Sequence, residues 1–72
     1  ALEAFRQAQK LQPRNISFAL NTAQSLLRLI ASAPDEALKE ECRNCLQQVR
    51  SIPPSDSRYE RYLKLCKHVE AA

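Results

Sequence analysis

Three cysteines and a single histidine are the residues of this chain best suited to chemistry. Cys42 and Cys45 have the two-residue spacing of a metal-binding or redox pair, and Cys66 with His68 would complete four zinc ligands. Zinc pairs of this kind usually lie on turns, whereas this pair falls in a segment with helical periodicity. On a helix, Cys66 and His68 would point about 200° apart. We therefore favour cysteines buried as small hydrophobic side chains over a zinc site or a redox pair.

Other catalytic combinations are not apparent in the sequence. No serine or cysteine is clearly placed to form a nucleophile–base set with His68. The adjacent carboxylates of Glu40 and Glu41 point apart on a helix, so we expect both to face solvent. The chain contains no glycine, and glycine-rich loops that cradle phosphates need it. These observations predict a protein that is not an enzyme, with no catalytic residues, no metal and no cofactor.

The composition predicts an all-α protein. The chain has 72 residues, 44% of them hydrophobic, and residues that favour helices, such as leucine, alanine and glutamine, are abundant. A chain of this length forms one small domain. The net charge of +3 is too small to indicate nucleic-acid binding by itself. No stretch reaches the roughly 20 apolar residues that span a bilayer. With an odd number of cysteines, these features favour a cytoplasmic location without membrane contact.

Prolines divide the chain into four predicted helices. The first two cover about residues 1–12 and 16–31, and Asn15 is the expected N-cap of the second. The third follows Pro34, with Ser32 as a candidate cap, and the fourth begins after residues 55–56. The expected apolar faces comprise, helix by helix, Leu2, Phe5, Ala8 and Leu11; Ile16, Leu20, Ala23, Leu26, Leu27, Leu29 and Ile30; Leu38, Cys42, Cys45, Leu46 and Val49; and Tyr59, Tyr62, Leu63, Cys66 and Val69.

The first thirteen residues carry a pattern that closes a helical repeat. Ala1 is followed by Phe5 four residues later, by Ala8 after three more, and then by Pro13. In these types and spacings the chain resembles the tetratricopeptide repeat (TPR) family. The resemblance implies an antiparallel stack of about four helices. Because the sequence opens midway through a repeat, we expect a C-terminal fragment of a longer bacterial protein of this family.

The resemblance also divides one TPR-like domain, residues 1–72, into three parts. Residues 1–13 correspond to the second helix of a repeat. Residues 16–52 correspond to a degenerate helical pair, in which Cys42 and Cys45 take the aromatic and alanine positions. Residues 55–70 correspond to a capping helix or to the first helix of a further repeat. Residues 13–27 also resemble repeat segments at the C-terminal ends of bacterial signalling proteins such as response regulators.

Two sets of residues are candidates for binding a partner. In the TPR family the first helix of each pair lines a concave groove that binds peptides, and the register implies four partner-binding residues: Phe18, Asn21, Ser25 and Arg28. The arginine among them can hold a carboxylate with two hydrogen bonds. A second set forms a possible basic contact stripe on the fourth helix: Arg58, Arg61, Lys64 and Lys67.

The sequence therefore predicts a non-catalytic protein–protein interaction domain, which presents a TPR-like groove to a peptide or helix of a partner. The alternative is a homo-oligomerisation module of a larger signalling protein, in which Leu2 and Phe5 of the first helix pack against a second copy in a homodimer. Nucleic-acid binding through the basic fourth helix is the less favoured interpretation.

Overall fold

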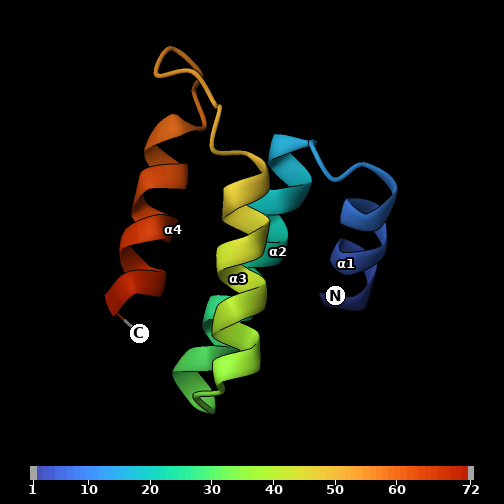
Figure 1. Ribbon diagram of the computed structural model, residues 1–72, viewed down its shortest axis with the longest axis vertical. Helices are drawn as coiled ribbons and strands as arrows, with labels where there is room; N and C mark the ends of the chain where they lie inside the picture. Colours follow the sequence, from blue (N-terminus) through green and yellow to red (C-terminus); the bar gives the residue numbers. More distant parts are fainter. Residues whose placement is uncertain (1, 72) are drawn as a thin grey trace.

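Four helices make up the computed structural model, which describes residues 2–71. They are α1 (Leu2–Leu11), α2 (Ile16–Ser32), α3 (Glu36–Gln48) and α4 (Tyr59–Ala71). In Figure 1, α1 and α3 run in one direction while α2 and α4 run in the other. Residues 2–71 contain no strand, so the predicted all-α, antiparallel helix stack is confirmed. The predicted start of the first helix at Ala1 lies outside the described residues.

The helix starts follow from capping side chains. Asn15 is the N-cap of α2, as predicted, because its Oδ1 accepts a hydrogen bond of 3.1 Å from the backbone N–H of Phe18. The cap of α3 is Asp35, which accepts from the backbone N–H of Ala37 at 2.8 Å. Ser32 is instead the last residue of α2. Asp35 has the extended backbone that an N-cap requires, with φ −148° and ψ 124°.

Helix α2 is the centre of the fold because each of the other three helices packs against it. Figure 1 shows α3 in front of α2, with α1 and α4 on opposite sides of this pair. Such a helix needs a wide buried stripe, and the buried residues of α2 are Ala19, Leu20, Thr22, Ala23, Leu26 and Ile30. The hydroxyl of Thr22 donates to the carbonyl of Phe18 at 2.9 Å, so this buried polar group has a partner.

The hydrophobic core lies between α2, α3 and α4. Its buried members are Leu20, Ala23, Leu26 and Ile30 of α2; Cys42, Cys45 and Leu46 of α3; and Leu65 and Val69 of α4. The apolar face predicted for the third helix is confirmed, since its two cysteines, Leu46 and Val49 are buried and Leu38 is half-buried.

The apolar faces predicted for the first and fourth helices are confirmed in most positions, since Leu2, Phe5, Tyr62 and Cys66 are half-buried and Val69 is buried, but one leucine of each helix lies outside. Leu11 is 81% exposed and Leu63 is 47% exposed, whereas Gln9 and Leu65 are buried. Each buried residue lies two positions from the leucine expected inside, which is about 200° around a helix. Helix α1 turns Gln9 inward because α3 offers hydrogen-bonding partners there. On α4, Leu65 lies one turn after Arg61, which hydrogen-bonds to α2.

The complete burial of Leu20 predicts a large loss of stability when this side chain is truncated. Leu20→Ala should lower the free energy of unfolding by about 2–5 kcal/mol, because it removes buried methyl groups and leaves a cavity. As a control, Leu11→Ala on the exposed surface of α1 should change it by no more than about 0.5 kcal/mol. Urea denaturation of both variants gives the two values, and equal losses would contradict this assignment of the core.

Candidate functional site

A salt bridge fixes the start of α4. Asp56 accepts from the backbone N–H of Arg58 at 2.8 Å and from its guanidinium through Nε at 2.9 Å and Nη2 at 2.8 Å. The remaining guanidinium nitrogen of Arg58 donates to the hydroxyl of Ser17 on α2 at 2.9 Å. These hydrogen bonds, above all those from the guanidinium, lower the pKa of Asp56 to about 2. Arg58 thereby ties the entry of α4 to the first turn of α2.

A second arginine ties the next turn of α4 to the same face of α2. Arg61 donates from Nη2 to Oδ1 of Asn21 at 3.1 Å and to Oε1 of Gln24. At about 100° per residue, Ser17, Asn21 and Gln24 lie within about 60° of one another on α2. The polar face of α2 is therefore turned towards α4.

Helices α2 and α4 form an open groove of about 340 Å³ that begins at Arg61 and is called here the basic groove. Helix α2 contributes Gln24, Leu27, Arg28 and Ala31 to its lining. Helix α4 contributes Arg61, Lys64, Leu65 and His68. The lining combines apolar side chains with arginine and lysine side chains, and it includes no acidic residue. Such a surface can hold a ligand that carries carboxylates beside an apolar group.

The residues predicted on the second helix fall into two places. Arg28 is exposed and lines the basic groove, and Asn21 adjoins it through the hydrogen bond from Arg61. Phe18 and Ser25 are half-buried. Each directly follows a residue of the face that contacts α4, Ser17 or Gln24, and so lies about 100° away from that residue around the helix. Gln24 was missed, although its spacing of three and four residues from Asn21 and Arg28 places it on the same face.

The four basic residues predicted on α4 do not share one surface. Arg58 and Arg61 hydrogen-bond to α2, and Arg61 also lines the basic groove. Lys64 lines the basic groove, whereas Lys67 is exposed and is not among the lining residues. His68 is exposed, lies four residues after Lys64 and also lines the groove.

The predicted burial of two cysteines is confirmed. Cys42 and Cys45 are free thiols in the core, and the Sγ of Cys42 donates to the carbonyl of Ala23 at 3.5 Å. Burial raises the pKa of Cys42 to about 11 and also raises the pKa of Cys45. Both are therefore protonated at neutral pH and pack as small hydrophobic side chains. Among residues 2–71, no three His, Cys, Asp or Glu side chains lie close enough together to hold a metal ion.

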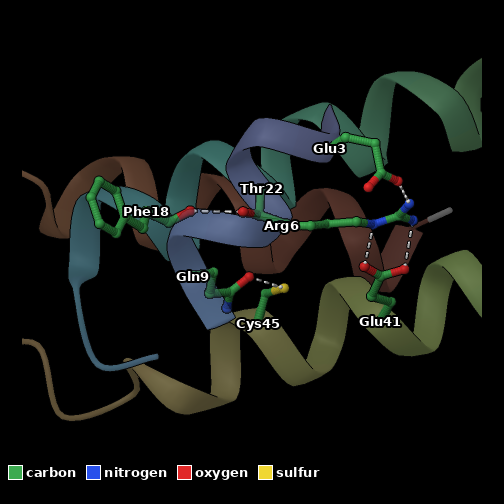
Figure 2. Close-up of polar contacts among 7 residues, drawn as sticks. All are labelled: Glu3, Arg6, Gln9, Phe18, Thr22, Glu41 and Cys45. Atoms are coloured by element: carbon green, nitrogen blue, oxygen red, sulfur yellow. Dashed lines mark hydrogen bonds and ion pairs between the residues drawn. The ribbon is translucent and has the colours of Figure 1, made fainter. Parts of the chain in front are cut away.

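On the opposite side of α2, a bidentate ion pair joins α1 to α3. Arg6 donates from Nε and Nη2 to the two carboxylate oxygens of Glu41, at 2.8 and 2.9 Å (Figure 2). Its third nitrogen donates to Glu3 at 3.2 Å. The hydrogen bonds to Glu41 raise the pKa of Arg6 above its ordinary value. Glu40 is exposed as predicted, whereas Glu41 is half-buried because α1 brings an arginine against it.

A buried glutamine makes two further hydrogen bonds between α1 and α3. The Oε1 of Gln9 accepts from the Sγ of Cys45 at 3.1 Å (Figure 2). Its Nε2 donates to the Oε1 of Gln48 at 3.2 Å. The carboxamide thus uses both its acceptor and its donor within the fold, which offsets the cost of burying it.

No family model, curated protein or solved structure matches this chain. Within residues 2–71, none of the helices combines the length and apolar character needed to cross a membrane.

The lowered pKa of Asp56 predicts a loss of stability in acid. The pKa of about 2 in the folded state lies below the ordinary value of 3.8, so the ionised carboxylate stabilises the fold above about pH 4 and this contribution disappears between about pH 4 and pH 2. Asp56→Asn should remove this part of the pH dependence. Urea denaturation across this range tests it, with the exposed Glu70→Gln as control. Parallel profiles for Asp56→Asn and the unmodified protein would contradict it.

The burial of two thiols predicts an order of alkylation. Cys66 is half-buried, whereas Cys42 and Cys45 are buried and have raised pKa values, so iodoacetamide should modify Cys66 first. Mass spectrometry of the folded protein, sampled over time, measures the three rates, and the urea-unfolded protein is the control in which all three should react. Equal rates for Cys42 and Cys66 in the folded protein would refute the assignment.

Proposed function

We propose that this chain is a non-catalytic protein-interaction domain whose basic groove binds a peptide or helix that carries carboxylates. One observation carries the proposal: Arg28 of α2 and Arg61, Lys64 and His68 of α4 line the same groove, with no acidic residue among them. Guanidinium groups bind carboxylates with two parallel hydrogen bonds, and a lysine adds a compact positive charge.

The ion pairs of the domain support this role for the groove. The salt bridges formed within residues 2–71 involve Arg6, Lys39, Arg43 and Arg58, and none includes Arg28 or Lys64. Arg61 hydrogen-bonds to the neutral side chains of Asn21 and Gln24. The positive charge of the groove is therefore not neutralised by a carboxylate of the same domain, and a carboxylate of a partner can take that place.

The helix arrangement supports assigning the domain to the TPR type. The repeat register makes α2 the first helix of a pair, and we take α4 as the first helix of a further repeat rather than as a capping helix. In that family the first helices line the peptide groove. Here α2 and α4 pack against each other and enclose the basic groove. We therefore place the partner across α2 and α4, with its carboxylates at Arg28 and Lys64.

Charge reversal at two lysines of α4 tests this placement. Lys64→Glu should weaken binding of an acidic peptide by about tenfold or more, because it removes a charged hydrogen-bond donor and adds repulsion. Lys67→Glu makes the same change on the same helix outside the groove and should alter binding by less than about threefold. The probe is a fluorescein-labelled Asp-Glu-Leu-Asp-Glu peptide, measured by anisotropy, with Asn-Gln-Leu-Asn-Gln as the uncharged control.

Arg28→Ala provides a second test, because Arg28 is exposed and its loss should weaken binding without unfolding the domain, as circular dichroism can verify. Equal weakening by Lys64→Glu and Lys67→Glu would mean unspecific attraction to the charge of α4. Equal binding of the uncharged peptide would exclude carboxylate recognition. Tighter binding of single-stranded DNA, with a steep dependence on salt, would favour nucleic acid as the ligand.

A further inference from the structure

We infer that the groove between α1 and α3 binds an extended, uncharged polypeptide segment through its main chain. This groove, called here the amide groove, has a volume of about 490 Å³, within the range of roughly 300–1,000 Å³ that is usual for ligand sites. Helices α1 and α4 lie on opposite sides of the α2–α3 pair (Figure 1), so the amide groove is separate from the basic groove. The inference thus goes beyond the function proposed above.

Long side chains span the space between α1 and α3. The two helices do not pack backbone against backbone, although each packs against α2. The Arg6–Glu41 pair bridges them at one point, and the contact of Gln9 with Cys45 bridges them one turn further along (Figure 2). All four of these side chains line the groove. Because these side chains set the distance between α1 and α3, the groove between the two helices stays open to a ligand.

The charges of the amide groove cancel. Glu3 and Glu41 are matched by Arg6 and Lys10, and Arg6 already donates to both carboxylates. A charged ligand therefore gains little electrostatic attraction in the amide groove, whereas the basic groove attracts carboxylates. The groove instead suits a ligand whose polar groups are neutral hydrogen-bond donors and acceptors.

Three carboxamides supply the matching groups. Gln7 of α1 and Asn44 and Gln48 of α3 are exposed and line the groove, and each carboxamide offers both a donor and an acceptor. A residue in an extended chain turns its N–H and its C=O to the same side, and the next residue turns them to the other side. One carboxamide can therefore satisfy both main-chain groups of one residue.

The spacing of the carboxamides on α3 fits alternate residues of an extended chain. Asn44 and Gln48 are four residues apart, which is about 6 Å along a helix. Residues i and i+2 of an extended chain are about 6.6–6.8 Å apart. Gln48 is already oriented, because its Oε1 accepts from the Nε2 of Gln9 at 3.2 Å. The second lone pair of that oxygen and the amide hydrogens of Gln48 are left for the N–H and the C=O of the ligand.

Main-chain recognition of this kind predicts binding that tolerates changes of ligand side chain. The probes are three capped, uncharged hexapeptides of unrelated sequence, each paired with a version that is N-methylated at every residue. We expect the native peptides to shift the side-chain amide signals of Asn44 and Gln48 in ¹⁵N–¹H NMR spectra of the folded protein. The N-methylated peptides, which have lost their main-chain donors, should leave these signals unchanged.

Two exposed residues of α3 supply the matched variants. Asn44→Ala should weaken binding of the native hexapeptides by about tenfold, because it removes two hydrogen bonds. Gln47→Ala removes a carboxamide of α3 that does not line the amide groove and should change binding by less than about twofold. If no native peptide shifts Asn44 and Gln48, or if N-methylated peptides shift them equally, the inference is wrong. Binding of the acidic peptide at Arg28 and Lys64 is read from separate signals, so either proposal can fail alone.

Discussion

The burial of α2 on three sides is the constraint on which the rest of this domain depends. Each of the other helices has only 10 to 13 residues, a length at which an isolated helix is marginal in water. They gain stability by packing against α2, whose alanines at positions 19 and 23 let neighbouring helices approach closely. A side chain of α2 such as Leu20 or Leu26 therefore contributes to the placement of more than one neighbour.

The neighbours of α2 are fixed in different ways, and this difference creates the grooves. Helix α3 packs through apolar side chains and cysteines in the core. Helix α4 adds apolar residues to that core but is also held to α2 by Arg58 and Arg61. Helix α1 has no close backbone contact with α3 and is joined to it by the side-chain hydrogen bonds of Arg6 and Gln9. Where long polar side chains set the distance between two helices, the space between the backbones is not filled by a close-packed core, and a groove remains.

Local signals in the sequence were sufficient for the number of helices, the cap at Asn15 and the buried cysteine face of α3. They were not sufficient for the end of α1, where Gln9 rather than Leu11 is buried. Apolar periodicity predicts that Leu11 is buried, because it considers only the cost of exposing each apolar side chain. The partners that make Gln9 acceptable inside are 36 and 39 residues away in sequence.

The same limit applies to the candidate site. Arg28 was predicted from α2 alone, but its convergence with Lys64 and His68 depends on α2 and α4 lying side by side in the same direction.

The chemical character of each groove follows from the partner of its bridging arginine. Arg6 meets the carboxylate of Glu41, so its charge is neutralised and the groove between α1 and α3 presents carboxamides beside side chains whose charges cancel. Arg61 meets the carboxamides of Asn21 and Gln24, which satisfy its hydrogen bonds without cancelling its charge. The field of Arg61 therefore adds to that of Arg28 and Lys64 within the groove between α2 and α4. The type of acceptor that the bridging arginine meets, carboxylate or carboxamide, thus gives one small helical domain two grooves of different charge, and neither requires a change in the fold.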